Sequence, residues 1–215
     1  MKLLLWRVVM VTLVLSRVSS VTRGEGYCVT YSDCGGVPCV NNTPAKPISS
    51  YQTLSSLREF CPHLKEESGF CCDAEQVTIM EKALSKADNL LKCTPGRDNF
   101  RTLICDMVCG PNQANYLEIT ESKQYGDRIQ ATHIKYFIST EYSDAVWRST
   151  RKQSKLLCGK IFSECSKQDL FKFIGDNRWT KLKTDYVIEN TPSRPGIKHS
   201  SPSQLACPSS SSCQC

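Results

Sequence analysis

The sequence predicts a disulfide-rich α+β fold formed by a single domain. Three observations support this prediction. Fourteen cysteines all follow the first twenty of 215 residues, apolar residues recur at helical spacing up to residue 108, and short runs typical of strands follow residue 111. No internal repeat divides the chain, so one domain is expected over residues 21–190.

Residues 1–20 are expected to be a signal peptide. Lys2 and Arg7 form a basic lead, residues 8–15 are apolar, and residues 18–20 provide the small side chains that precede a cleavage site. No later segment reaches the roughly 20 apolar residues that a transmembrane span requires. The protein is therefore expected to be secreted and to have no transmembrane span.

The charge balance argues against a nucleic-acid partner. Without the three basic residues of the leader, 24 Lys and Arg face 21 Asp and Glu, a formal charge of +3. The one local basic cluster, around residues 148–155, is expected to be a solvated helix face.

The first half of the mature chain is expected to hold a turn-rich segment and then three helices. Residues 27–47, with two adjacent glycines and three prolines, favour an irregular loop or a small ribbon. Helices are predicted around residues 51–61, where Pro62 stops the pattern, over 73–92, and from Asp98 to Gly110.

Gln76 permits two interpretations. It follows Asp73 by three positions, which is the spacing of a capping box at a helix start. It also lies beside the apolar face formed by Val77, Met80 and Leu84, where a single polar group would orient a ligand in an apolar pocket. The residue types alone favour the capping role.

The cysteines constrain how these helices lie. Cys105 and Cys109 share a helix face, but side chains four residues apart are too distant for an ordinary disulfide. The adjacent Cys71 and Cys72 also point in different directions. The economical solution links the third helix to the segments around Cys61 and Cys72 and holds the helix that bears Gln76.

The second half is expected to mix strands and helices before a tail of low complexity. Strands are predicted over residues 116–120, 134–139 and 185–189, and helices over 142–155 and 166–174. Residues 191–215 are rich in Ser and Pro and would be disordered without their cysteines.

The chain lacks the motifs of common enzymes. It has no G-x-S-x-G, H-E-x-x-H, P-loop or dinucleotide-binding pattern, and its histidines, His63, His133 and His199, are far apart in sequence. It also lacks a C-x-x-C pair, which disfavours zinc. We expect a protein that is not an enzyme and that holds no metal or cofactor.

Fourteen cysteines in an exported chain indicate seven disulfides. A mature chain of this length can bury a core without them. An internal pocket of about 300 Å³ would cost on the order of 7 kcal/mol when empty, and disulfides at roughly 2–4 kcal/mol each would offset this cost. General resistance to unfolding explains the count equally well.

Several motifs together resemble one known family. They are Cys28 and Cys34, Cys61-Pro62, Cys71-Cys72-Asp73 with Gln76, Cys93 with Cys105 and Cys109, and Leu156-Leu157-Cys158-Gly159-Lys160 with Cys165. In this order they resemble the N-terminal lumenal domain of the large Niemann-Pick type C protein over essentially the whole mature chain. More distantly, the chain is similar to the folate-receptor and riboflavin-binding group.

The resemblance implies a sterol-binding module in which helices pack with a small mixed sheet around an apolar cavity. It implies that Gln76 bonds the sterol hydroxyl. The other positions that it places on or near the pocket are Thr30, Asp33, Pro38, Ile79, Met80, Ala83, Ile104, Gln113, Ile134, Tyr136, Leu156, Leu157 and Trp179.

The family also implies how the cysteines pair. The pairs are Cys28 with Cys71, Cys34 with Cys39, Cys61 with Cys105, Cys72 with Cys109, Cys93 with Cys213, Cys158 with Cys165, and Cys207 with Cys215. A further family pair is absent, and Gly96 occupies one of its positions.

The chain departs from the family in three respects. Pro38 replaces an asparagine that also binds the hydroxyl, so Asp33, Asn41, Asn42 or a backbone group would have to substitute for it. Thr30 replaces an aromatic residue at the pocket entrance. The transmembrane and sterol-sensing parts of the family do not follow Cys215 in this sequence.

Three functions are compatible with the sequence. The first is a secreted carrier of a sterol or a similar apolar lipid, with transfer to another soluble lipid carrier expected by analogy. The second is a vitamin binder, which the scarcity of tryptophan disfavours because flat conjugated rings are usually stacked on aromatic side chains. The third is an interaction module that has lost its ligand and acts at a cell or pathogen surface.

Asn41 begins an N-glycosylation sequon with Asn42 and Thr43. A sequon in an exported chain predicts a surface position for Asn41.

Overall fold

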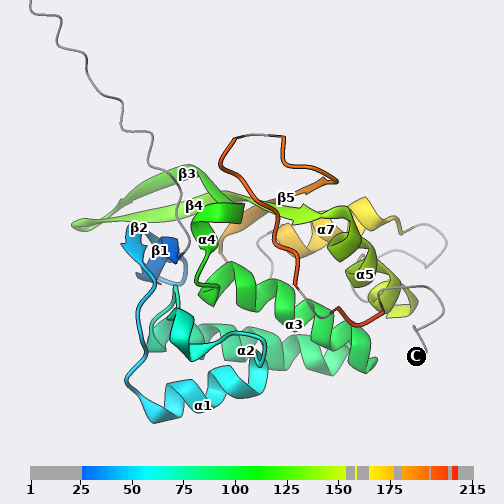
Figure 1. Cartoon of the computed structure of the whole chain (residues 1–215), viewed down its shortest axis with the longest axis horizontal. Helices are drawn as coiled ribbons and strands as arrows, with labels where there is room; N and C mark the ends of the chain where they lie inside the picture. Colours follow the sequence, from blue (N-terminus) through cyan, green and yellow to red (C-terminus); the bar gives the residue numbers. More distant parts are fainter. Residues whose placement is uncertain are drawn as a thin grey trace, which may run out of the picture.

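The computed structural model describes residues 26–153, 158, 165–176, 181–193, 195–202 and 205–207. The predicted leader lies outside these ranges. The described part is a disulfide-rich α+β domain in which a layer of three helices lies against a small mixed sheet and two further helices flank the sheet at one end (Figure 1).

The turn-rich segment forms a two-stranded ribbon, one of the two alternatives that the sequence left open. Strands β1 (Tyr27–Asp33) and β2 (Pro38–Pro44) pair antiparallel, and Cys34–Cys39 closes their turn. Within this turn the Asp33 carboxylate accepts the N–H groups of Gly35 and Gly36 at 2.9 Å. Gly35 has a φ of +78°, a left-handed backbone that favours glycine.

The three predicted helices are present, with a different start for the third. Helix α1 spans Tyr51–Phe60, α2 spans Ala74–Leu90 and α3 spans Thr94–Cys109. The sequence placed the start of the third helix at Asp98, four residues too late. Pro95 lies in the first turn of α3, where proline is favoured because its missing N–H has no helical partner in any case.

The strands predicted at 116–120 and 134–139 belong to one long hairpin. The short helix α4 (Gln113–Tyr116) leads into β3 (Leu117–Tyr125), which pairs antiparallel with β4 (Arg128–Ser139). Residues 121–129 are exposed on both faces of the ribbon and so show no alternation of apolar and polar residues. This is why the sequence revealed only the two buried ends of the hairpin.

The chain then crosses over to a parallel strand. Helix α5 (Thr140–Thr150) begins two residues before the helix predicted over 142–155 and continues as a 3₁₀ turn at Arg151–Gln153. Residues 154 and 155 lie outside the described residues. Helix α7 (Lys167–Gly175) begins with the capping box of Ser166 and Asp169. Strand β5 (Lys183–Glu189) pairs parallel with β4, and the five strands have the order β1-β2-β4-β3 with β5 beside β4.

Five disulfides join described residues: Cys28–Cys71, Cys34–Cys39, Cys61–Cys105, Cys72–Cys109 and Cys158–Cys165. They are pairs that the family resemblance implies. Cys93 and Cys207 are also disulfide-bonded. Their implied partners, Cys213 and Cys215, lie outside the described residues.

Backbone hydrogen bonds hold the described part of the tail, in addition to the cysteines that the sequence relied on. The Lys198 N–H donates to the Asn115 carbonyl at 2.7 Å, and the Ser200 N–H donates to Phe137 at 3.0 Å. Asn99, which is 2 % exposed, both donates to and accepts from the backbone of Ala206. The segment therefore runs back across α4 and α3 toward α5 (Figure 1).

Candidate ligand-binding cavity

An apolar cavity opens between helices α2 and α3, the β1–β2 turn and the sheet. Its enclosed volume is about 60 Å³, and the whole depression, including the part open to solvent, measures about 640 Å³. The residues that line it are Thr30, Asp33, Gly36, Val37, Pro38, Gln76, Ile79, Met80, Ala83, Ile104, Met107, Val108, Leu117, Ile134 and Leu182.

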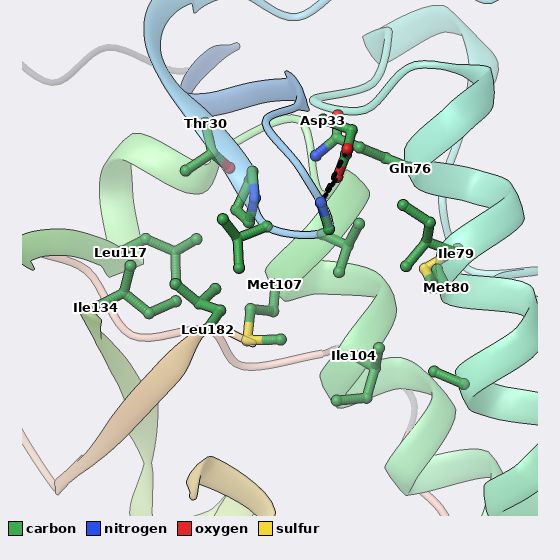
Figure 2. A pocket seen from close by; sticks show the side chains of 15 residues that line it. Thr30, Asp33, Gln76, Ile79, Met80, Ile104, Met107, Leu117, Ile134 and Leu182 are labelled. Atoms are coloured by element: carbon green, nitrogen blue, oxygen red, sulfur yellow. Dashed lines mark hydrogen bonds between the residues drawn. The ribbon is translucent and has the colours of Figure 1, made fainter. Parts of the chain in front are cut away.

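The cavity has an apolar body and one polar end. Figure 2 shows Ile104, Met107 and Leu182 in its body, with Asp33 and Gln76 together at the end formed by the β1–β2 turn. Ile79, Ala83 and Val108 are only half-buried, so the opening lies along the facing edges of α2 and α3.

Gln76 caps helix α2, as its spacing from Asp73 predicted, and it also lines the cavity. Its backbone N–H donates to Asp73 at 3.0 Å, and its Oε1 accepts the N–H of Asp73 at 3.3 Å, which completes the capping box. Oε1 also accepts the N–H of Ser32 at 2.7 Å. Ser32 has a φ of +68°, a strained backbone for serine that aims its N–H at the amide.

These contacts fix which atom of Gln76 is available. Oε1 is engaged by two backbone donors, whereas Nε2 makes no hydrogen bond to any described residue, although the whole residue is only 6 % exposed. Nε2 is not sealed inside the protein and is accessible from the cavity that Gln76 lines. The geometry therefore leaves a hydrogen-bond donor ready for an acceptor in the cavity.

Gln113 lies behind the cavity wall instead of in it. It is fully buried, and its Oε1 accepts from Val29 N, Thr30 N and Thr30 Oγ1 at 3.2–3.3 Å. Its Nε2 donates to the carbonyls of Met107 and Val108 at 2.9 and 3.0 Å. Gln113 ties β1 to α3, and its hydrogen-bonding capacity is fully used.

The other residues implied by the family divide into three groups. Those that line the cavity with Gln76 are Thr30, Asp33, Pro38, Ile79, Met80, Ala83, Ile104 and Ile134. Tyr136 does not: it is fully buried in a row of rings, with its centroid 5.6 Å from those of Tyr116 and Tyr186. Leu156, Leu157 and Trp179 lie outside the described residues.

Six lining residues were not singled out from the sequence: Gly36, Val37, Met107, Val108, Leu117 and Leu182. Met107 and Val108 follow Ile104 by three and four positions, so the helical period could have found them. Leu182 comes from the segment before β5, and no local pattern brings that segment to the cavity.

No constellation resembling a catalytic site or a metal centre appears in the described part of the chain. The histidines are separated, with His63 at 2.8 Å from Asp106, His133 at 2.9 Å from Asp185 and His199 at 3.4 Å from Glu189. No group of three or more potential metal ligands occurs among the described residues. Every described helix is also too short or too polar to traverse a bilayer.

Fold and cavity together define a small disulfide-linked α+β domain with an apolar cavity that opens to solvent. A family model described as the Niemann-Pick C1 N terminus matches residues 25–215. The chain belongs to this family.

Relatives with known names are much longer proteins. Over 139 residues the chain is 32 % identical to human "NPC1-like intracellular cholesterol transporter 1", with 57 % of the chain and 10 % of that protein covered. It is 25 % identical over 175 residues to the Caenorhabditis elegans "NPC intracellular cholesterol transporter 1 homolog 1", with 70 % and 12 % covered. For the pig "NPC intracellular cholesterol transporter 1" the values are 22 % over 170 residues, with 68 % and 13 % covered. The chain thus spans about a tenth of these relatives.

Proposed function

We propose that this protein binds a sterol resembling cholesterol, or a related flat apolar lipid, and carries it without chemical change. One observation carries the proposal: an apolar cavity whose polar end presents the unpartnered Nε2 of Gln76. The names of the relatives, which are cholesterol transporters, support the same ligand class.

A sterol hydroxyl would have two partners at the polar end. Nε2 of Gln76 would donate a hydrogen bond to the hydroxyl oxygen. The Asp33 carboxylate would accept a hydrogen bond from the hydroxyl O–H. Asp33 thereby replaces the asparagine that the family has at Pro38, because Asp33 lines the cavity whereas Asn41 and Asn42 are exposed on β2. One such hydrogen bond is worth about 0.5–1.5 kcal/mol, so it selects the ligand more than it holds it.

The apolar body supplies the affinity. Burial of about 300 Å² of ring surface at about 25 cal/mol per Å² contributes roughly 7 kcal/mol before the entropy cost of association. An enclosed volume of about 60 Å³ is well below the roughly 300 Å³ of a small-molecule pocket. Entry of a sterol therefore requires the walls to separate, and Met80 and Met107, with long unbranched side chains, are suited to repacking.

The lining argues against a vitamin ligand. None of the described residues around the cavity is aromatic, so a flat conjugated ring would have nothing to stack on. The small enclosed volume does favour the third function, an interaction module without a ligand, if the walls cannot separate.

We further propose that the protein acts outside the cell. The predicted leader and the disulfides support secretion, and the exposure of Asn41 on β2 supports glycosylation there. By analogy, the bound lipid would pass to or from another soluble lipid carrier. Secretion and a mobility shift on treatment with an endoglycosidase are expected, and Asn41→Gln should abolish the shift.

The test of the ligand uses protein purified from the medium of secreting cells. Extraction and mass spectrometry should identify a co-purified sterol, and Gln76→Ala should weaken uptake of radiolabelled cholesterol about two- to tenfold. Lys82→Ala, on the exposed side of the same helix, should bind as the unmodified chain does. If the unmodified protein neither carries nor takes up a sterol, the ligand-free alternative is correct.

A further inference from the structure

A second, polar cleft lies on the other side of α3 from the apolar cavity. It has a volume of about 520 Å³. Three segments form it: the connection between α1 and α2, the end of α3 with α4, and residues 198–202 of the tail. No residue lines both the cleft and the apolar cavity, although the adjacent residues Asp106 and Met107 face one each.

Asn115 is the residue of this cleft that indicates a binding site. The residue is 5 % exposed and lines the cleft, yet its side-chain amide makes no hydrogen bond to any described residue. Its backbone is fully engaged, since its N–H donates to Asn112 at 2.9 Å and its carbonyl accepts from Lys198 at 2.7 Å. Its amide atoms are not sealed off from solvent, so they face the open space of the cleft and can bond to a group that enters it.

The remaining lining indicates the charge of that group. Lys65, Lys198, His63 and His199 all line the cleft. Asp106 contributes the one carboxylate among the described lining residues, and both of its oxygens are engaged. Oδ1 lies 2.8 Å from His63 Nε2, and Oδ2 accepts from Ser200 Oγ at 3.0 Å. His63 and His199 lie against the carboxylates of Asp106 and Glu189. The cleft therefore offers an incoming group the Asn115 amide as a donor and the positive charge of Lys65.

From this arrangement we infer that the cleft is a second binding site, for a small molecule carrying a carboxylate, phosphate or sulfate group. The Asn115 amide N–H and the Lys65 ammonium donate to the anionic oxygens, and charge-assisted hydrogen bonds of this kind are about twice as strong as neutral ones. The volume exceeds that of the bare anion and leaves room for the rest of a small polar molecule.

Titration of the ¹⁵N-labelled chain with sodium sulfate, phosphate or acetate tests this site, with sodium chloride at equal ionic strength as the reference. Saturable shifts are expected in the Asn115 side-chain amide and in the backbone amides of Lys65 and Ser68. The anion that binds most tightly identifies the group. Asn115→Asp, which keeps the shape but adds a negative charge, should weaken binding at least tenfold.

Lys65→Ala removes an exposed side chain and should also weaken binding, so the test does not depend on the folding of a core variant. Lys123→Ala, on the exposed hairpin, is the matched control. Shifts that do not saturate, or that persist in both Asn115→Asp and Lys65→Ala, would overturn the inference. Sterol uptake by Asn115→Asp reports separately on the apolar cavity and should equal that of the unmodified chain.

Discussion

At the scale of single residues, Gln76 connects the helix start to the cavity. Its side-chain oxygen accepts hydrogen bonds from the backbone N–H groups of Ser32 and Asp73. Because the oxygen is held there, the side-chain nitrogen is left to face the cavity. The capping box could be predicted from the spacing of Asp73 and Gln76. The left-handed backbone of Ser32 could not, because glycine is the usual signal for that conformation and serine gives none.

Gln76→Glu should separate the two roles. A glutamate still accepts both backbone N–H groups, and glutamate is itself a favoured capping-box residue, so the fold should be retained. The donor to the ligand is lost. Binding of a sterol with a ketone in place of the hydroxyl should fall at least tenfold, because a ketone can only accept, whereas a hydroxyl can still donate to the carboxylate. Competition against radiolabelled cholesterol measures both ligands, and equal losses for the two would contradict this account.

Pro38→Asn should restore the hydroxyl partner that the family has. Pro38 lines the cavity opposite Asp33 in the ribbon register, so an asparagine amide placed there can reach the polar end. One added hydrogen bond at about 0.5–1.5 kcal/mol predicts a two- to tenfold gain in affinity for cholesterol. Pro38→Ala, which offers no polar group, is the control for the change in backbone. An equal gain in both variants would mean that loop freedom, not the amide, is responsible.

At the scale of elements, α3 is the helix that the others are built around. It contacts α2, carries Cys105 and Cys109, and presents Met107 to the cavity and Asp106 to the cleft. Sequence patterns predicted its existence and its cysteine face. They placed its start too late, because residues 94–97 have no apolar periodicity and are held by the contact with α5 instead.

Gly96 marks that contact. A Cβ on Gly96 would lie 2.6 Å from the Ser149 carbonyl oxygen of α5. This oxygen belongs to the helix backbone and cannot easily move away. Gly96→Ala should therefore lower the free energy of unfolding by about 1–3 kcal/mol, whereas in an unobstructed helix the change would raise it by up to about 1 kcal/mol. Denaturant unfolding measures the difference. Asp98→Ala, exposed on the same helix, should stay within about 0.5 kcal/mol, and a gain for Gly96→Ala would show that α5 shifts freely.

The sheet shows which features a local sequence pattern can predict and which it cannot. The buried ends of β3 and β4 were predictable because they carry apolar residues on one face. The exposed middle of the hairpin has no apolar face to reveal it. The strand at 185–189 was predicted, but its parallel pairing with β4 joins segments about 50 residues apart, as for Ile134 and Thr184. The short range of a sequence pattern does not reach that far, which also explains why Leu182 was missed as a cavity residue.

At the scale of the whole molecule, three buried tyrosines and the half-buried Tyr186 make the fold sensitive to alkali. Burial raises the pKa of Tyr116, Tyr136, Tyr142 and Tyr186 above the ordinary value, and the negative charge of Asp106 adds to the effect for the first three. The unfolded chain ionises near pH 10. The stability linked to these groups is therefore complete below about pH 10 and is lost as the pH rises toward their folded pKa values.

Denaturant midpoints should thus be constant from pH 8 to 9 and fall steeply above pH 10. Tyr142→Phe should lessen this fall. Its hydroxyl is buried without a hydrogen-bond partner among the described residues, so its removal should also leave stability at pH 8 unchanged or higher. Absorbance at 295 nm follows tyrosinate directly. Ionisation of the buried rings without loss of the fold would contradict the prediction.

Three disulfides overlap along the chain, and this gives the protein a tolerance to proteases. The loops closed by Cys28–Cys71, Cys61–Cys105 and Cys72–Cys109 together cover residues 28–109 without a gap. A single backbone cut anywhere in that range leaves both pieces covalently joined. A nicked molecule should therefore migrate as one band until a reducing agent is added, and it should keep its cavity through damage that would divide an unlinked domain.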